Sequence, residues 1–541
     1  MPDRHHIFSR NNLLLYGIAL LLLPALLVHL GLSAFTDDEG IRALVALEMD
    51  ISHNYLTPTM FGELYYNKPP LYNWILLAVY KLTGRTDEFI SRLPTVFFLL
   101  AYAATVYHFF KKNIALPDPR PSQPSAHTAL LPPLALITCG RILFWDSMLG
   151  LIDTCFSWVM FSLFMVIYHE GEKGRYWRLF VLSYLLAAIG FMLKALPAVV
   201  FLGIALPVYF VWQKKWRHLF SWAHVAGVAL FAGIVGSYYF LYARENGLTT
   251  IAGTIFHESA KRTFVEYGLW ETVRHFFTFP FEMWFHFLPW TLLLVYFLRK
   301  DAWRHILRNK FITWNLLVFA ATVLPYWSSV EVYPRYLFMH VPLVFSAFIY
   351  LHFINQKEKT RQWQLVEKTF FGLCILATIA SLLPPFWPAL QGIPYLWAKT
   401  AGLALGMGAL TVFYWRWKPQ RMLIFVLVLL VARLGFDWFV LPSRQAIDCR
   451  NFVRDSTLAA VEKLGGQPLY IYQNSLGNQP VTGYYFTRET GQVLTSVHHD
   501  FDRPGFYLVN TSLYPKDDFE ELCKVRVKWE CGELMIGRWR G

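Results

Sequence analysis

The stretch Thr36–Leu71, TDDEGIRALVALEMDISHNYLTPTMFGELYYNKPPL, is a polar interruption directly after the first long apolar segment of the chain. It carries acids at Asp37, Asp38 and Glu39, several aromatic residues, and Lys68 followed by two prolines. Most of the remaining chain is apolar, and charged groups are costly in hydrocarbon, so we place this stretch at a membrane boundary. We expect the other segments to be arranged around it.

Composition is typical of a polytopic membrane protein. Of the 541 residues, 55% are hydrophobic, 18% aromatic and only 16% charged, a balance unlike that of soluble enzymes. The net charge of +13 comes from short basic clusters between apolar segments, as the positive-inside rule expects of cytoplasmic loops. We therefore predict membrane lipids as partners and no nucleic acid.

Apolar runs long enough to cross a hydrocarbon core of roughly 30 Å recur along the chain and predict about thirteen spans. They are 13–32, 91–110, 128–145, 149–168, 178–194, 196–212, 219–242, 283–298, 312–328, 335–354, 368–388, 395–414 and 421–441. The first run follows Arg4 and Arg10 and lacks a small-residue cleavage site, so we interpret it as a retained signal anchor. Segment 71–83 is too short to cross and is expected to be interfacial or re-entrant.

Basic clusters fall on every second connection, which predicts a cytoplasmic N-terminus. The loop after Leu32, the long loop 243–282, the loop 329–335 and the C-terminal tail then lie outside. After Leu441 the chain becomes polar, so we divide it into a transmembrane domain, 1–441, and a soluble extracytoplasmic α/β domain, 442–541. The fold class is thus mainly α, a polytopic helical membrane protein with a small C-terminal α/β domain.

Within the tail, residues 448–466 predict a helix that ends at a glycine pair. The segments LYIYQ, GYYF, QVLTSV, GFYLVN and VRVKW predict strands. Cys523 and Cys531 are candidates for a disulfide. We interpret the tail as a lid or docking module that has no chemistry of its own.

Ionisable residues at the boundary of spans are functional candidates, because insertion of a charge costs about 2.5–3.5 kcal/mol. The topology brings a set of them from six segments to one outer face. They are Asp38, Lys68, Asp146, Lys194, His257, Glu258, Arg262 and Arg335, with Asp153 one or two turns deeper. A transporter would concentrate such groups near the midplane. An extracytoplasmic active site is favoured, and a transporter or flippase of a lipid-linked or small anionic substrate is the alternative.

Asp38 is the candidate general base, since a carboxylate beside a second acid suits proton transfer near neutral pH; the alternative is that the acids only cap the helix IRALVALEMD. Lys68 is set in an extended backbone by the following proline and suits a phosphate, unless it snorkels to headgroups. Arg262 and Arg335 would add bidentate contacts to the same anion.

Phosphate as a leaving group needs one base for the acceptor hydroxyl and cations for the anion, without a general acid. The seven-residue spacing of Asp146 and Asp153 would place both on one face of a continuous helix. Tyr66 stands among aromatic residues suited to stack on a sugar ring, although aromatic belts at membrane interfaces are common.

Five motifs occur in an order that resembles the C-type glycosyltransferases, which use polyprenyl-phosphate sugars, and within them the protein O-mannosyltransferase and lipid A aminoarabinose transferase group. They are Asp38-Glu39, Lys68-Pro69-Pro70, Arg92-Leu93-Pro94, Lys194-Ala195-Leu196-Pro197 and Pro334-Arg335-Tyr336. The resemblance covers about residues 13–440. It implies a GT-C fold in a bacterial inner membrane and inverting transfer from an undecaprenyl-phosphate sugar, as in lipid A modification or protein O-glycosylation.

The resemblance implies Asp38 as the base and Lys68 on the donor phosphate, together with Lys194, Arg262 and Arg335. The further substrate contacts it implies are Glu39, Tyr66, Asp146, Asp153, Glu258 and Tyr336. Whether Asp146 or Asp153 is the family's second acid stays open, as does the acceptor, which is a lipid A, a protein or a glycan. No cofactor is assigned; a divalent metal with His257 as a ligand stays open, and Asn67 replaces a glutamate usual in aminoarabinose transferases.

Overall fold

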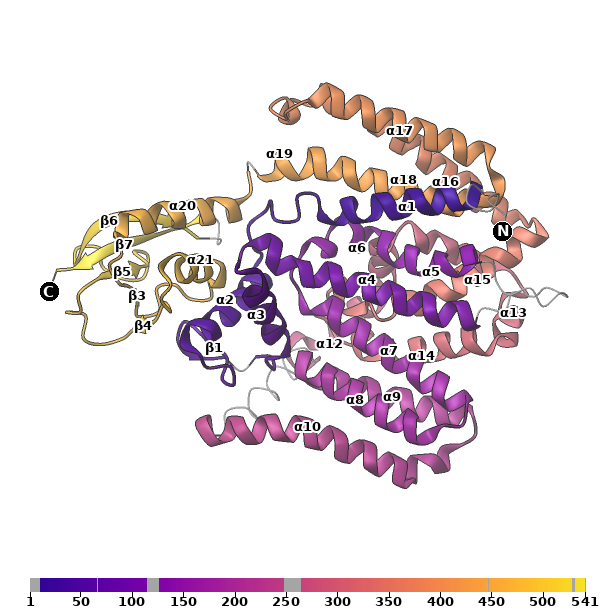
Figure 1. Ribbon diagram of the computed structural model, residues 1–541, viewed down its shortest axis with the longest axis horizontal. Helices are drawn as coiled ribbons and strands as arrows, with labels where there is room; N and C mark the ends of the chain where they lie inside the picture. Colours follow the sequence, from indigo (N-terminus) through magenta and orange to yellow (C-terminus); the bar gives the residue numbers. More distant parts are fainter. Residues whose placement is uncertain are drawn as a thin grey trace, which may run out of the picture.

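The computed structural model describes residues 10–65, 67–113, 126–247, 264–445, 447–527 and 531–540. A long bundle of helices makes up most of the molecule, and a small α/β domain sits at one end of it (Figure 1). Helix α1 (Arg10–Leu27) begins at the opposite end of the bundle, and helices α2 (Asp37–Ser52) and α3 (Leu71–Thr83) lie beside the α/β domain. The mainly helical fold class predicted from the sequence is confirmed.

Every predicted apolar run overlaps a helix of the bundle. The helices are α1 (Arg10–Leu27), α4 (Glu88–Asn113), α5 (Ala126–Thr138), α6 (Gly140–Phe144), α7 (Ile152–Glu172), α8 (Tyr176–Lys194), α9 (Leu196–Trp212), α10 (Trp222–Asn246), α12 (Phe264–His286), η4 (Trp290–Leu298), α13 (Ala302–Arg308), α14 (Lys310–Trp327), α15 (Val341–Glu358), α16 (Arg361–Ala380), α17 (Leu396–Arg416), α18 (Arg421–Gly435) and α19 (Leu441–Gln445).

Seven helices of the described chain are long and apolar enough to cross a membrane, or eight if the pair Ala129–Thr138 and Gly140–Met148, bent by 46°, forms one span. The other predicted runs form shorter or irregular elements. Helix α9, for example, has 17 residues, and the run 283–298 is divided between α12 and the 3-10 helix η4. Fewer helices than thirteen therefore qualify on length and composition alone.

The outer loop is built from two short helices and a hairpin. Helix α2 (Asp37–Ser52) starts in a capping box between Thr36 and Glu39. Helix α3 (Leu71–Thr83) has only 13 residues and ends at Gly84, whose φ of 66° suits a glycine C-cap. Strands β1 (Thr59–Met60) and β2 (Glu63–Leu64) form the hairpin between them. As expected, α3 is too short to span a membrane.

The C-terminal domain holds a five-stranded sheet of order β4-β3-β5-β7-β6. Its elements are α20 (Cys449–Leu464), β3 (Leu469–Tyr472), α21 (Pro480–Thr490), β4 (Ser496–Val497), β5 (Phe506–Val509), β6 (Phe519–Arg526) and β7 (Glu533–Trp539). Strand β3 runs parallel to β4 and β5, whereas β7 is antiparallel to β5 and β6.

The predicted helix 448–466 corresponds to α20, but the prediction of a strand at GYYF was wrong. These residues lie in α21, with Pro480 in its first turn and Gly491 as its C-cap. All four are buried, and a short buried apolar run has no periodicity that distinguishes a strand from a helix. Strand β7 was not predicted at all.

The C-terminal domain shares its core with helix α2. Phe35 and Leu44 belong to the same buried cluster as Tyr484 and Tyr485 of α21, and Phe35 packs edge-on against Tyr484 with ring centroids 4.9 Å apart. The buried carboxylate of Glu88, at the start of α4, accepts a hydrogen bond of 2.7 Å from the Tyr485 hydroxyl. The domain is therefore fixed to the outer loop through a continuous apolar core.

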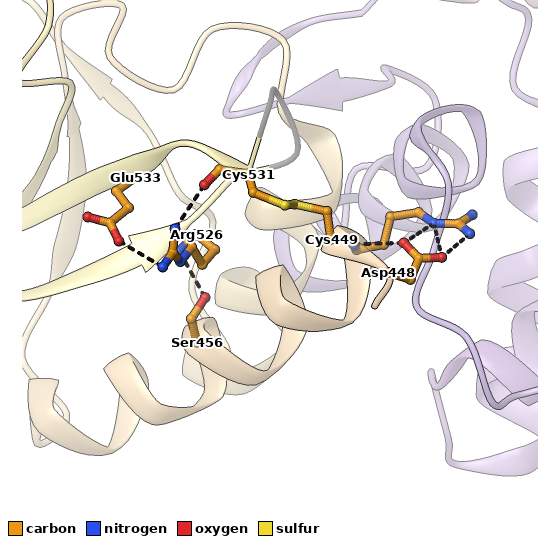
Figure 2. The surroundings of a disulfide bond; sticks show 7 residues. Asp448, Cys449, Ser456, Arg526, Cys531 and Glu533 are labelled. Atoms are coloured by element: carbon orange, nitrogen blue, oxygen red, sulfur yellow. Dashed lines mark hydrogen bonds and ion pairs between the residues drawn. A yellow bond between two sulfur atoms is a disulfide. The ribbon is translucent and has the colours of Figure 1, made fainter. Parts of the chain in front are cut away.

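One disulfide joins Cys449 at the start of α20 to Cys531 just before β7, as Figure 2 shows. The pairing of Cys523 with Cys531 considered from the sequence was wrong. Cys523 lies within β6, where its backbone is paired with Ile536 of β7 and its thiol stays free. The disulfide closes 82 residues of chain.

Candidate active site

Asp38 occupies the first turn of α2, and its side chain is 53% exposed. Its Oδ2 atom accepts a hydrogen bond of 2.6 Å from the guanidinium of Arg335, which lies in the 3-10 turn η5 (Pro334–Leu337). The two residues are 297 positions apart in the chain. Folding thus brings the predicted base and one predicted phosphate ligand into direct contact.

Arg335 also reaches Asp153 at the start of α7, with 3.4 Å between Nε and Oδ2. The other oxygen of Asp153 accepts a hydrogen bond of 2.5 Å from the Nζ of Lys194, the last residue of α8. Asp38, Arg335, Asp153 and Lys194 therefore form a row of alternating charges, which we call the charge row. Only Asp38 is well exposed; the other three side chains are 9–14% exposed.

Aromatic rings support the cations of the charge row. The Nζ of Lys194 lies 3.7 Å from the ring centroid of Tyr336, and the guanidinium of Arg335 lies 4.4 Å from that of Tyr333. Such cation–π contacts hold a charge in place without neutralising it. Arg335 thus pairs with two carboxylates, those of Asp38 and Asp153, and also lies against an aromatic ring.

Asp146 lies at the edge of the same cluster, in the 3-10 turn η2 (Asp146–Met148). Its Oδ2 accepts a hydrogen bond of 2.5 Å from Arg141 Nε, and it interacts electrostatically with Arg335 and Asp153. Arg141 was missed from the sequence, although its position five residues before Asp146 was a usable signal.

Asp146 and Asp153 could share one helix face only if the helix were continuous, and it is not. The chain is extended between η2 and α7, at Leu149 and Leu151. Glu39 holds this break open, because its Oε1 accepts the backbone N–H of Gly150 at 2.6 Å. The two acids approach Arg335 from separate elements instead.

Lys68 stands immediately before α3, and its Nζ donates to the side-chain oxygen of Asn67 at 3.0 Å. Its charge also acts on the Asp153 carboxylate. Pro69 and Pro70 are buried, so the lysine is attached to a fixed backbone. The structure therefore brings Lys68 within electrostatic reach of Asp153.

Glu39 is almost fully buried, and its carboxylate binds the Arg92 guanidinium at 2.8 and 3.1 Å. It also accepts the Thr36 backbone N–H at 2.9 Å. Burial alone would raise the pKa of Glu39, but Arg92 and these backbone donors hold the pKa below its ordinary value. With both oxygens occupied, Glu39 is arranged to position Asp38 and Gly150.

Four predicted site residues, Tyr66, His257, Glu258 and Arg262, lie outside the described residues. Among the residues that the structure describes, no three side chains of His, Cys, Asp or Glu come together as a metal site. The predicted residues that do meet are Asp38, Lys68, Asp146, Asp153, Lys194, Arg335 and Tyr336.

This fold and this cluster resemble those expected of the C-type membrane glycosyltransferases. A family model described as dolichyl-phosphate-mannose-protein mannosyltransferase matches residues 67–239. That range includes Lys68, Asp146, Asp153 and Lys194. The resemblance expected from the motifs is confirmed, and the chain is a multi-pass membrane protein.

Among solved structures, the chain is similar to ArnT from Cupriavidus metallidurans bound to undecaprenyl phosphate, with a TM-score of 0.69, 15% identity, and coverage of 98% of this chain and 99% of that chain. The apo state of the same protein gives a TM-score of 0.68 at 16% identity, covering 97% of this chain and 98% of that chain. At this identity the likeness concerns the fold. No curated protein matches the chain in sequence.

Proposed function

We propose that the chain is an inverting glycosyltransferase that moves a sugar from a polyprenyl phosphate carrier, such as undecaprenyl phosphate, to a lipid, protein or glycan acceptor. The observation that carries this proposal is the contact between Asp38 and Arg335, which sets an exposed carboxylate beside a supported cation. A base for the acceptor and a cation for the leaving phosphate are the two groups that the reaction requires.

In the reaction, Asp38 accepts the proton of the acceptor hydroxyl as that oxygen attacks C1 of the sugar. The bond between C1 and the phosphate oxygen breaks, and the phosphate leaves with the electron pair as polyprenyl phosphate. Attack from the side opposite the leaving group inverts the configuration at C1. No general acid is needed, because the phosphate departs as a stable anion.

Arg335 links these two roles. When a donor phosphate enters, it competes with Asp38 for the exposed side of the guanidinium, while Asp153 holds the other side. Asp38 then loses its ion-pair partner, and its carboxylate is released to accept the proton of the acceptor hydroxyl. Donor binding would thereby free the base.

Lys68 is the second donor ligand in this proposal, and Lys194 contributes through its hold on Asp153. The ArnT structure was solved with undecaprenyl phosphate, which supports a carrier of this type. The disulfide Cys449–Cys531 supports an outer-face location, in the periplasm of a bacterial inner-membrane protein, because disulfides persist in oxidising compartments.

The test is transfer by purified Asp38→Asn protein in liposomes supplied with undecaprenyl-phosphate sugar and an envelope extract as acceptor source. We expect a loss of about 10²–10⁴-fold, the usual contribution of a general base. The matched control is Asp50→Asn, at the other end of α2, where the carboxylate pairs with the exposed Lys81.

Undiminished transfer by folded Asp38→Asn protein would remove the proposed base. Movement of the lipid-linked sugar across sealed vesicles without any covalent product would instead support the transporter alternative.

A further inference from the structure

A polar cavity of about 680 Å³ lies between the outer loop and the C-terminal domain. One wall is the β1–β2 hairpin with the segment that follows it, including Tyr65 and Asn67. The other wall belongs to the C-terminal domain and is formed by Asn474 and Asn478 after β3, by Ser496 in β4 and by His498 directly after β4. Its size is that of ordinary small-molecule sites, about 300–1,000 Å³.

Two lining residues of the cavity are close in the chain to the proposed base and to the proposed phosphate ligand. Asn67 lines it and also accepts the hydrogen bond from Lys68, the proposed phosphate ligand. Ile41 of α2 lines it as well, and residues three apart on a helix are surface neighbours, so Asp38 lies beside it on α2. A molecule in the cavity would therefore lie next to the segments that carry the proposed base and the proposed ligand of the donor phosphate.

The lining has the chemistry of a site for hydroxyl groups. Side-chain amides of Asn67, Asn474 and Asn478 offer donors and acceptors together, and Ser496 adds a hydroxyl. The described lining residues include a single acid, Glu63, and one histidine, His498, but no lysine or arginine. A phosphorylated headgroup would call for cations in this wall.

The walls are held rigidly. The buried Glu48 carboxylate accepts the Thr59 hydroxyl at 2.7 Å and the backbone N–H groups of Phe61 and Gly62 at 2.7 and 3.2 Å. Gly62 packs so closely on the C-terminal domain that a Cβ there would lie 2.8 Å from Thr495. A site formed in advance loses less entropy on binding.

We infer that this cavity binds the acceptor, and that the acceptor presents an uncharged saccharide there. This inference rests on the proposed glycosyltransferase function and gives the C-terminal domain a part in it. Strand ends of the domain would recognise the acceptor, while α2 and Lys68 supply the reactive groups.

Binding is tested with full-length protein in nanodiscs by saturation-transfer NMR, with neutral manno-, malto- and chito-oligosaccharides as probes and a bis-phosphorylated glucosamine disaccharide as competitor. We expect a saturation-transfer signal for at least one neutral probe. This signal should be reduced tenfold or more in the double variant Asn474→Ala/Asn478→Ala. Both asparagines are exposed, so the double variant should fold. The control is Gln492→Ala, an exposed amide outside the cavity.

Undecaprenyl phosphate binding, measured on the same samples, should be equal in all three proteins. Three results would each overturn the inference. They are the absence of a saturation-transfer signal for every neutral probe, an equal signal in the wild type and the double variant, and binding of the phosphorylated disaccharide alone. If the wild-type protein did not bind undecaprenyl phosphate, this result would instead count against the proposed function itself.

Discussion

Arg335 contacts carboxylates from two helices, and its exposed side is the proposed place of the donor phosphate. Hydrogen bonds to charged groups contribute about 1.5–3 kcal/mol. We therefore expect Arg335→Ala to raise the donor KM about tenfold or more. Arg335→Lys should restore only part of the wild-type affinity for the donor, because an ammonium group lacks the planar guanidinium that reaches two partners.

The measurement is initial-rate kinetics with the lipid-linked donor varied. Arg274→Ala serves as control, since that arginine is exposed and pairs with Glu271 one turn away. A donor KM that stays at the wild-type value in Arg335→Ala would exclude Arg335 as a phosphate ligand.

Glu39 is the residue whose protonation should govern acid stability. Its pKa in the folded protein is below the ordinary value of 4.5, so the folded state binds fewer protons than the unfolded state. Its contribution is present above pH 4.5 and is lost as the pH falls below that value. Wild-type Tm in detergent should therefore fall more steeply below about pH 4.5 than that of Glu39→Gln.

At pH 7 Glu39→Gln should be the less stable protein, by about 3–5 kcal/mol, because Arg92 is left buried without its counter-charge. Parallel pH profiles of the two proteins, measured by thermal unfolding, would contradict this assignment.

At the scale of elements, the close approach of α2 and α21 fixes the C-terminal domain. A Cβ at Gly40 would lie 2.8 Å from the Val481 side chain and 3.0 Å from its backbone nitrogen. Gly40→Ala should therefore destabilise the protein by about 1–3 kcal/mol, as overpacking does. It should also speed proteolysis of the tail.

Gly233→Ala in α10 is the matched control. A Cβ there meets no atom within 4 Å, and alanine is the better helix former by about 1 kcal/mol. This variant should be neutral or slightly stabilising in the same thermal and proteolytic assays. Equal behaviour of both variants would show that the α2–α21 contact adjusts easily.

At the scale of the whole molecule, the C-terminal domain and the outer-loop helices lie at one end of the bundle and the start of helix α1 at the other (Figure 1). We expect the domain to be outside the cell membrane. In intact spheroplasts of a Cys523→Ser protein, an impermeant maleimide should label Cys449 and Cys531 only after reduction. Lys359→Cys, at the exposed C-cap of α15, should be labelled only after permeabilisation.

Labelling in the opposite pattern would show that the protein has the opposite orientation in the membrane. The control is the same Lys359→Cys protein in detergent, where every exposed thiol should react.

The sequence by itself determined the membrane class, the position of the helices and the identity of most cluster residues. These follow from hydrophobicity and from charges that are costly in a membrane, both of which are local properties. Asp38 and Arg335 were singled out in this way, although their contact spans 297 positions.

Only the tertiary structure decided which side chains contact one another. The charge row, the role of Glu39 at the Gly150 break, the Cys449–Cys531 pair and the cavity beside Asn67 each join segments distant in the chain. No local sequence pattern encodes these long-range contacts, because they depend on how buried faces pack. The same reason explains GYYF, whose burial on α2, and not its own preference, makes it part of a helix.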